Sequence, residues 1–403
     1  MSSNLMQNIA TVEAGEDRTM VLNMGPQHPS THGVLRLLLE IDGETIVKIA
    51  PDIGFLHTGI EKTYEAKFYQ QGIPLADRMD YLAPFSNELG FCLAVEKLLG
   101  MEIPERAVWM RVLLTELTRI NSHLVWLGTH AMDIGAMTVF LYCFREREEL
   151  LKLFEAIGGQ RMFTSYFRVG GLAMEAPLDW FARVKKFVDT FPEKVDEYEG
   201  LLTGNPIWQQ RTKGVAHISA EDVIRLGGSG PILRASGVDW DLRRDMPYCG
   251  YEKFQFKVPT HPDGDVWARY VVRVAELRES QKICKQALDG MPGGAIKADA
   301  PKIILPDREK MKTQMEALIY HFKIVTEGFT VPPGDVYQAI ESPRGEIGFY
   351  VVSNGTAQPY RVHVRAPSFA NLALLPAMCE GKLIADVVAA IGSIDIVLGD
   401  VDR

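Results

Sequence analysis

The sequence PERAVWMRVLLTELTRINSHLVWLGTHAMDI, residues 104–134, decides the fold. Pro104 suits the first turn of a helix, and no proline follows it in this stretch. At 1.5 Å per residue, a helix of about 30 residues is about 45 Å long, which is the width of a whole domain. One stripe of this helix is apolar at intervals of three and four residues and is therefore expected to be buried: Leu113, Leu117, Ile120, Leu124 and Leu127.

Other parts of the chain show a helical pattern as well. Ser86 is expected to cap a helix that reaches Leu99, with Gly100 as its stop. Ser219 and Asp222 resemble a capping box for a short helix. The remaining predicted helices cover about 138–157, 178–202 with a kink or break at Pro192, 265–288, 307–327 and 377–391.

Strands are expected near both ends of the chain. Apolar runs on either side of Asp42-Gly43 predict a hairpin, and 346–353 and 359–365 flank a second turn signal, Asn354-Gly355. The predicted fold class is α+β, a long-helix bundle with small antiparallel sheets at its N- and C-terminal ends. We expect one packed domain with four regions: a flexible N-terminus (1–19), a β region with a loop (20–65), a helical bundle (66–340) and a β/α region (341–403).

Composition argues against several classes of function. The chain has 403 residues and a net charge of −9, which does not favour nucleic acid as a partner. No apolar run approaches about 20 residues, so no segment is expected to span a membrane. The polar, acidic start resembles neither a signal peptide nor a transit peptide. The five cysteines form no Cys-x-x-Cys pair, so we expect no zinc or iron–sulfur site built from this chain alone.

Two histidines, His28 and His32, lie in Gly25-Pro26-Gln27-His28-Pro29-Ser30-Thr31-His32-Gly33. The prolines fix the backbone around them, so the segment is predicted to be a stiff loop and not the interior of a helix. An imidazole exchanges a proton near neutral pH or binds a metal. Metal binding, proton transfer and a structural role are all open, and His57 or Asp133 would be the third ligand of a metal site.

The long helix also carries polar residues. Arg119 and His123 share one face, as do His130 and Asp133. They are either exposed or ordinary buried pairs, or they form a polar pathway inside the bundle. Tyr81, likewise, is either a core tyrosine or a phenol that donates a hydrogen bond to a carbonyl oxygen.

Taken together, these segments resemble the D subunit of the proton-pumping NADH:quinone oxidoreductase, respiratory complex I. The resemblance runs nearly from end to end. The matching motifs are GPQHPSTHGVLRL (25–37), GFLHTGIEK (54–62), RMDY (78–81), AVEKLL (94–99), THAMDIGA (129–136), RASG (234–237), MEALI (315–319), VPPG (331–334), ADVV (385–388) and DVDR (400–403).

That family is similar in turn to the large subunit of nickel–iron hydrogenases, which implies a hydrogenase large-subunit fold. Those enzymes hold their metal with two cysteine pairs, one near each end of the chain. Here the stretch after Gly59-Ile60-Glu61 has no cysteine, and the C-terminal end offers only Cys379. Hydrogenase chemistry is therefore not expected, and the metal interpretation of the histidines is weakened.

The resemblance implies a quinone site. His32 and Tyr81 would flank the quinone headgroup, Asp133 would hydrogen-bond to His32, and these three would be the catalytic set. Arg78 would lie near the terminal 4Fe-4S cluster of the adjacent subunit, while His28 would mainly shape the loop. The substrate would be ubiquinone or menaquinone, reduced to quinol in a reaction coupled to proton pumping. The chain would hold no cofactor or metal of its own.

The resemblance also implies that the chain is active only within the assembled complex. Its partners would be the iron–sulfur B subunit and the C subunit of the peripheral arm, and the membrane-arm H subunit at the quinone entrance. The chain would sit as a peripheral subunit on the cytoplasmic side of the bacterial plasma membrane.

Two positions depart from the family pattern. Many relatives have Arg at the position of Thr58, and many have His in an Arg-Met-His motif where this chain has Phe163. Both changes remove positive charge near the cluster, so we expect a lower cluster potential with weak pH dependence, suited to a low-potential quinone such as menaquinone.

Two other functions stay open. One is a hydrogenase-like scaffold subunit of a ferredoxin-linked membrane complex. The other is a soluble metalloenzyme that uses the histidines.

Overall fold

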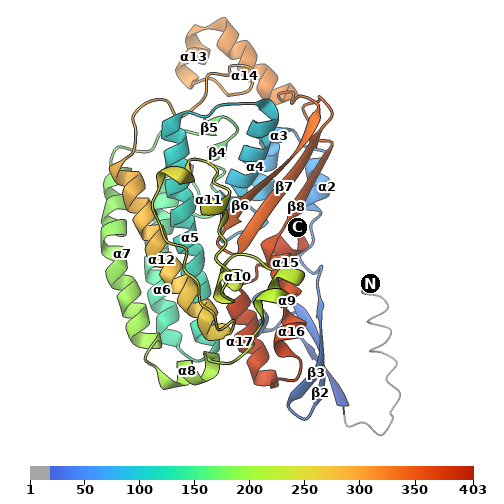
Figure 1. Ribbon diagram of the computed structural model, residues 1–403. Coiled ribbons are helices and arrows are strands. Elements are labelled where there is room, and N and C mark those ends of the chain that lie inside the picture. The colour runs from blue at the N-terminus through green and yellow to red at the C-terminus, as the bar shows by residue number, and fades with distance from the viewer. Residues whose placement is uncertain (1–18) are drawn as a thin grey trace.

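A bundle of long helices stands beside two small sheets in the computed structural model, which describes residues 19–403 (Figure 1). The predicted α+β fold class and the predicted central helix are confirmed. The middle of this helix, α5 (Glu105–Asp133), is buried because helices pack around it. Its neighbours are α4 (Pro84–Leu99), α6 (Met137–Gly158), α12 (Val266–Asp289) and α17 (Ile384–Ile394), and α7 (Trp180–Leu202) packs on α6 and α12.

Most of the predicted helix ends are confirmed by their caps. Gly100 adopts a left-handed conformation and ends α4. The Ser219 hydroxyl accepts a hydrogen bond from the Asp222 backbone N–H at 3.1 Å and so starts α9 (Ala220–Arg225). The prediction for Ser86 is wrong. Helix α4 begins at Pro84, which needs no N–H partner in the first turn, and Ser86 is buried inside the helix.

The N-terminal sheet consists of β1 (Thr19–Met24), β2 (Arg36–Asp42) and β3 (Thr45–Asp52) in antiparallel order. The predicted hairpin at Asp42-Gly43 is confirmed. The loop with the two histidines connects β1 to β2 and contains one 3₁₀ turn, η1 (Pro29–Thr31). Met24 pairs with Leu37, so the sheet register holds both ends of this loop together. The predicted flexible segment lies, except for Thr19, outside the described residues.

The C-terminal sheet has three antiparallel strands, β6 (Gly334–Ser342), β7 (Gly345–Ser353) and β8 (Arg361–Arg365). Strands β7 and β8 were predicted. Strand β6 was missed and lies mostly within the stretch assigned to the helical bundle. Its burial does not alternate along the strand, because its last residues are buried on both faces and Glu341 is among them. The two-residue strands β4 (Phe167–Arg168) and β5 (Gly171–Leu172) are too short to leave a pattern.

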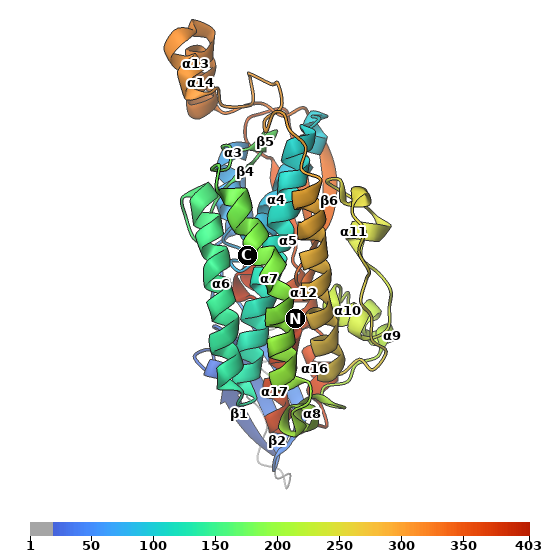
Figure 2. The same ribbon diagram turned by 90° about the vertical axis from the view of Figure 1, so that its left-hand side faces the viewer.

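Two predicted long helices are broken in the structure. Gln314 is extended and separates α13 (Arg308–Thr313) from α14 (Met315–Glu327), which together form an arm that stands off the body (Figures 1 and 2). The helix predicted at 377–391 is split into α16 (Leu375–Cys379) and α17. Here β3 competes for the backbone: Ile46 N–H donates to Lys382 O at 2.9 Å, and Gly381 N–H donates to Ile46 O at 2.8 Å. By contrast, α7 continues through Pro192.

Short helices and turns complete the fold. None of the helices in residues 19–403 combines the length and the apolar character that crossing a membrane requires. The remaining elements are α2 (Ile60–Tyr64), α3 (Tyr69–Ala76), α8 (Pro206–Thr212), α10 (Pro231–Ala235), α11 (Leu242–Asp245), η2 (Tyr251–Lys253), α15 (Pro367–Leu372) and α18 (Leu398–Asp402).

The crossing of α5 and α17 depends on a glycine. A Cβ atom on Gly392 would lie 2.2 Å from His130 Nδ1, and the Gly392 carbonyl accepts a hydrogen bond from Trp126 Nε1 at 2.7 Å. We expect Gly392→Ala to lower the free energy of unfolding by about 1–3 kcal/mol, because a buried, close-packed contact must open. Denaturant unfolding of the purified chain measures this change.

Gly200→Ala is the matched control. Gly200 is also helical and has no atom within 4 Å of a built Cβ, so the alanine should leave stability unchanged or raise it by up to about 1 kcal/mol. Equal stability of the two variants would contradict the close approach of α5 and α17.

Candidate functional site

The loop of the two histidines is shaped by its own hydrogen bonds. The backbone N–H of Ser30 donates to His28 Nδ1 at 3.2 Å, so His28 caps the turn η1. The Thr31 hydroxyl donates to the His28 carbonyl at 2.8 Å. His32 follows in a left-handed conformation with φ of 52°. His28 is exposed and serves the turn, whereas His32 points to the bundle and contacts α5.

His32 contacts Asp133, the last residue of α5. The distance from His32 Nε2 to Asp133 Oδ2 is 2.7 Å, and the two side chains are 18% and 8% exposed. The contact lacks the angles of a linear hydrogen bond, so both atoms still lack a well-oriented hydrogen-bond partner among the described residues. The structure thus brings together two residues that lie 101 positions apart and that were predicted to pair.

Tyr81 lies in the turn before α4. The carboxylate of Asp80 accepts a hydrogen bond from the Leu82 N–H at 3.2 Å, which fixes this turn on both sides of Tyr81. Tyr81 is half-buried, and its hydroxyl makes no hydrogen bond within residues 19–403. Burial raises the pKa of Tyr81 above its ordinary value, and Asp80 adds to this, while Arg344 acts in the opposite direction. At neutral pH the phenol therefore keeps its proton.

The Tyr81 turn and the His32 loop meet the same C-terminal segment. A Cβ on Gly399 would lie 2.4 Å from Met79 O and 3.4 Å from Tyr81 Cδ1. A Cβ on Gly33 would lie 3.0 Å from Leu398 Cδ1. Helix α18 is therefore wedged between the two segments that carry Tyr81 and His32.

Sequence reasoning missed a buried arginine in this region. Arg344 lies in the β6–β7 turn and pairs with Asp80 at 2.7 Å and with Asp395, at the end of α17, at 3.1 Å. The signal in the sequence was weak, because Ser-Pro-Arg-Gly between two strands is typical of an exposed turn. The one hint of a buried cation was Asp80, an acidic residue next to Tyr81 that would need a partner if buried.

Asp400 is a further buried carboxyl in α18. Its Oδ2 atom accepts a hydrogen bond from the Ser368 N–H at 3.0 Å, and its Oδ1 atom has no partner among the described residues. Burial, followed by the charge of Asp80, raises the pKa of Asp400 to about 6, against the opposing effect of the Ser368 hydrogen bonds.

Arg119, His123 and His130 of α5 are fully buried, so exposure is the wrong interpretation for these three residues. Arg119 pairs with Glu116, and His123 Nε2 lies 2.9 Å from Glu276 Oε2. His130 does not pair with Asp133, although both lie on one face. It lies between two indoles, Trp126 and Trp208, with ring centroids 5.7 and 5.3 Å away. Neither of its ring nitrogens has a hydrogen-bond partner among residues 19–403.

Arg78 is exposed. Its guanidinium lies 4.9 Å above the Phe163 ring, and its Nη1 atom donates to Pro74 O at 2.6 Å. Thr58 is exposed in a loop that Asp402 holds, because the Asp402 carboxylate accepts from the N–H groups of Gly54 and Leu56 at 2.9 and 2.7 Å.

The structure gives no support to the metal interpretation. His57 Nδ1 lies 2.5 Å from the backbone carbonyl of Asp402. In the part of the chain that the structure describes, no three His, Cys, Asp or Glu side chains are grouped closely enough to hold a metal ion.

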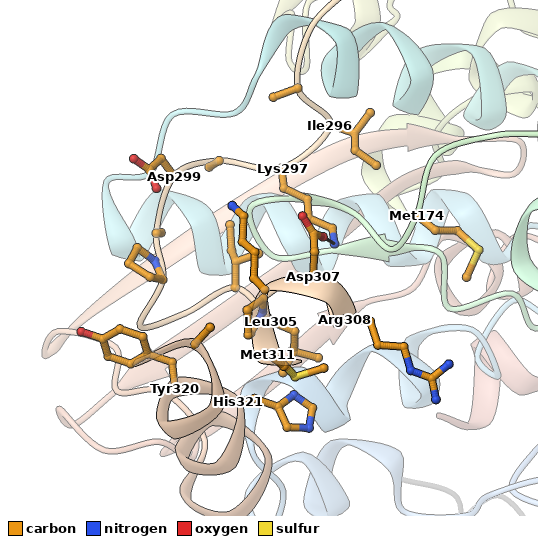
Figure 3. A pocket seen from close by; sticks show the side chains of 18 of the residues that line it. Met174, Ile296, Lys297, Asp299, Leu305, Asp307, Arg308, Met311, Tyr320 and His321 are labelled. Carbon is orange, nitrogen blue, oxygen red and sulfur yellow. Dashed lines mark hydrogen bonds and ion pairs between the residues drawn. The ribbon is translucent and has the colours of Figure 1, made fainter. Parts of the chain in front are cut away.

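A hollow of about 1010 Å³ lies elsewhere, between the α13–α14 arm and the body (Figure 3). Lys297, Arg308, Tyr320 and His321 are among its lining residues, and Lys297 pairs with Asp307 at 3.1 Å. None of the predicted site residues lines it. Apart from this hollow, His32 contacts Asp133, the Tyr81 hydroxyl makes no hydrogen bond within residues 19–403, and α18 touches the segments that carry His32 and Tyr81.

Comparison with known proteins gives full-length matches. The sequence pattern of the family described as "Respiratory-chain NADH dehydrogenase, 49 Kd subunit" matches residues 133–403. The chain is 76% identical, over 99% of each chain, to the NADH-quinone oxidoreductase D subunit 2 of Koribacter versatilis. It is 71% identical to the D subunit 1 of Solibacter usitatus (96% of this chain, 94% of the relative). It is 57% identical to the D subunit of Trichlorobacter lovleyi (95% and 98%).

The raised pKa of Asp400 predicts how stability depends on pH. Because the folded chain binds this proton more tightly than the unfolded chain, stability should fall as the pH rises from about 4 to the folded pKa of about 6. The Asp400→Asn variant lacks this loss, so its free energy of unfolding should gain up to about 3 kcal/mol relative to wild type across this window. Denaturant unfolding at several pH values measures it.

Asp299→Asn is the control. Because Asp299 is exposed, this substitution should leave the dependence of stability on pH unchanged. Parallel profiles of wild type and the Asp400→Asn variant would contradict a raised pKa at Asp400.

Proposed function

Since the chain belongs to the family of the 49 kDa, or D, subunits of NADH-quinone oxidoreductase, we propose that it contributes the residues that protonate quinone in that complex. It would form the quinone chamber together with a neighbouring iron–sulfur subunit. The observation that carries this proposal is that α18 touches both the loop of His32, which contacts Asp133, and the turn of Tyr81, whose hydroxyl makes no hydrogen bond within residues 19–403. The names of the relatives favour NADH over ferredoxin as the electron donor.

The chemistry needs two electrons and two protons for each quinone. The electrons would come from the 4Fe-4S cluster of the neighbouring subunit, and the protons need donors at the two carbonyl oxygens. The Tyr81 hydroxyl would donate to one oxygen as negative charge develops there, and protonated His32 to the other. Because His32 Nε2 faces Asp133, Nδ1 is the nitrogen left for the quinone. Asp133 would orient the ring and stabilise the imidazolium.

Membership of this family also suggests the neighbouring subunits. We propose the B and C subunits of the peripheral arm and the membrane-arm H subunit as neighbours, with the chain on the cytoplasmic side of the bacterial membrane. Exposed Arg78 would face the cluster, where a cation stabilises the reduced, more negative form. Reduction of the quinone would be coupled to proton translocation by the whole complex.

Tyr81→Phe tests the proposal. The variant loses only the hydroxyl, so quinone reduction by the assembled complex should fall by about 10²- to 10⁴-fold, while NADH still reduces the cluster. Quinone turnover gives the first quantity and the electron paramagnetic resonance of the cluster gives the second.

Tyr64→Phe is the control, because Tyr64 is buried on α2 and its hydroxyl also lacks a partner among the described residues. It should keep normal turnover. Normal turnover of the Tyr81→Phe variant would remove the basis of the proposal.

Phe163→His tests the proposed effect of the family departures on the cluster. An imidazole beside Arg78 would add positive charge at low pH, so the cluster potential should be higher there. It should fall as the pH rises, by at most about 59 mV per pH unit for a one-electron centre. Redox titration of the complex at several pH values measures it.

Phe163→Leu removes the ring without adding a titrating group and should leave the potential nearly independent of pH. A clear pH dependence of this cluster in the wild-type complex would contradict the idea.

A further inference from the structure

Asp80, Arg344 and Asp395 form a buried ion cluster beside the proposed quinone site. Arg344 Nη1 donates to Asp80 Oδ2 at 2.7 Å and to Ser122 Oγ at 2.9 Å, and Nη2 donates to Asp395 Oδ1 at 3.1 Å. Its Nε donates to the Asp395 backbone carbonyl at 2.8 Å. The guanidinium is fully buried, so its planar fork sets where these partners lie relative to one another.

Each carboxylate belongs to a segment that supports a proposed headgroup residue. Asp80 directly precedes Tyr81 and also binds the N–H on its other side. Asp395 ends α17, which packs against η1, the turn that leads into His32. Arg344 therefore joins the Tyr81 turn to the helix beneath the His32 loop, although it comes from a third part of the chain.

Packing alone does not explain why this cluster is charged, because apolar side chains would fill the same space. One guanidinium faces two buried carboxylates, and Asp395 Oδ2 keeps no partner among residues 19–403. The nearby cation Arg273 donates to the carbonyl groups of Ser393 and Ile394 at 2.7 and 3.4 Å and not to this carboxylate. A buried ion cluster contributes little net stability compared with apolar side chains of the same size, but it fixes geometry.

We propose that Arg344 is a positioning residue for quinone reduction, which holds Tyr81 and His32 at the separation that lets both carbonyl oxygens of a para-quinone be met at once. The inference rests on the proposed function of those two residues. The two oxygens lie on opposite sides of a rigid ring, so donors carried by separate segments need a fixed distance between them. Arg344 acts through Asp80 and Asp395 and does not itself touch the quinone.

A double-mutant cycle in the assembled complex tests this. Arg344→Lys keeps the charge, but one ammonium group does not span both carboxylates and the Asp395 carbonyl. We expect kcat for quinone reduction to fall about ten- to a hundredfold, with the KM for quinone within about threefold of wild type. Reduction of the cluster by NADH should stay normal. When Tyr81 is already replaced by Phe, adding Arg344→Lys should lower kcat only slightly further, because both changes disable the same hydrogen-bond donor.

Arg111→Lys is the matched control. Arg111 is equally buried and pairs with Glu96 through two hydrogen bonds at 2.9 and 2.7 Å, in a part of α5 outside the site. Its assembled complex should keep the wild-type kcat.

The outcomes separate the two proposals. A wild-type kcat in the Arg344→Lys variant would overturn the positioning role. So would a double variant whose fold-loss in kcat equals the product of the two single losses. Normal turnover of the Tyr81→Phe variant alone would instead overturn the proposed function. If Arg344→Lys prevents assembly, Ser122→Ala replaces it in the cycle, because it removes one acceptor and leaves the charges paired. Its expected loss in kcat is about two- to tenfold, and an unchanged kcat would overturn the role.

Discussion

Charges buried between α5, α12 and the C-terminal sheet constrain the structure, because each needs a partner on another element. Arg234 lies 2.6 Å from Glu276 of α12 and 2.8 Å from Glu341 of β6. Arg243 lies 3.2 Å from Glu116 of α5. A buried charge that loses its partner costs far more than a lost surface pair, so bundle and sheet cannot slide past each other. This constraint also fixes two parts of the proposed site, since Asp133 ends α5 and the turn of Arg344 follows β6.

Sequence periodicity was enough to predict the long helices, because an apolar stripe and a cap are local signals. The breaks at Gln314 and near Gly381 have other causes. At Gly381, the backbone of β3, more than 300 residues earlier, takes the hydrogen bonds that a continuous helix would need. Strand β6 was missed for a related reason: its buried Glu341 is acceptable only because Arg234 lies opposite, and no local pattern contains that partner.

In the proposed site, too, local spacing predicted one pair of residues and distant contacts form another. Spacing on α5 paired His130 with Asp133, and the structure separates them. His130 is enclosed by indoles, and burial lowers its pKa, so it is neutral at physiological pH. Asp133 instead meets His32, which a loop between two strands delivers. Only the resemblance to a family predicted that pair, since the histidine spacing alone left metal binding open. Arg344 lay outside every motif considered.

The carboxylates around Arg344 bear on where charge would reside during the proposed reduction of quinone. Asp80, Asp395 and Asp400 lie near one guanidinium, and a quinone that gains electrons beside three anions would be destabilised. Burial raises the pKa of Asp395 and brings that of Asp400 to about 6, while the charge of Arg344 opposes both shifts. Beside the proposed site, the buried guanidinium of Arg344 thus supplies positive charge that offsets these acids. The same arginine joins the two segments that carry Tyr81 and support His32.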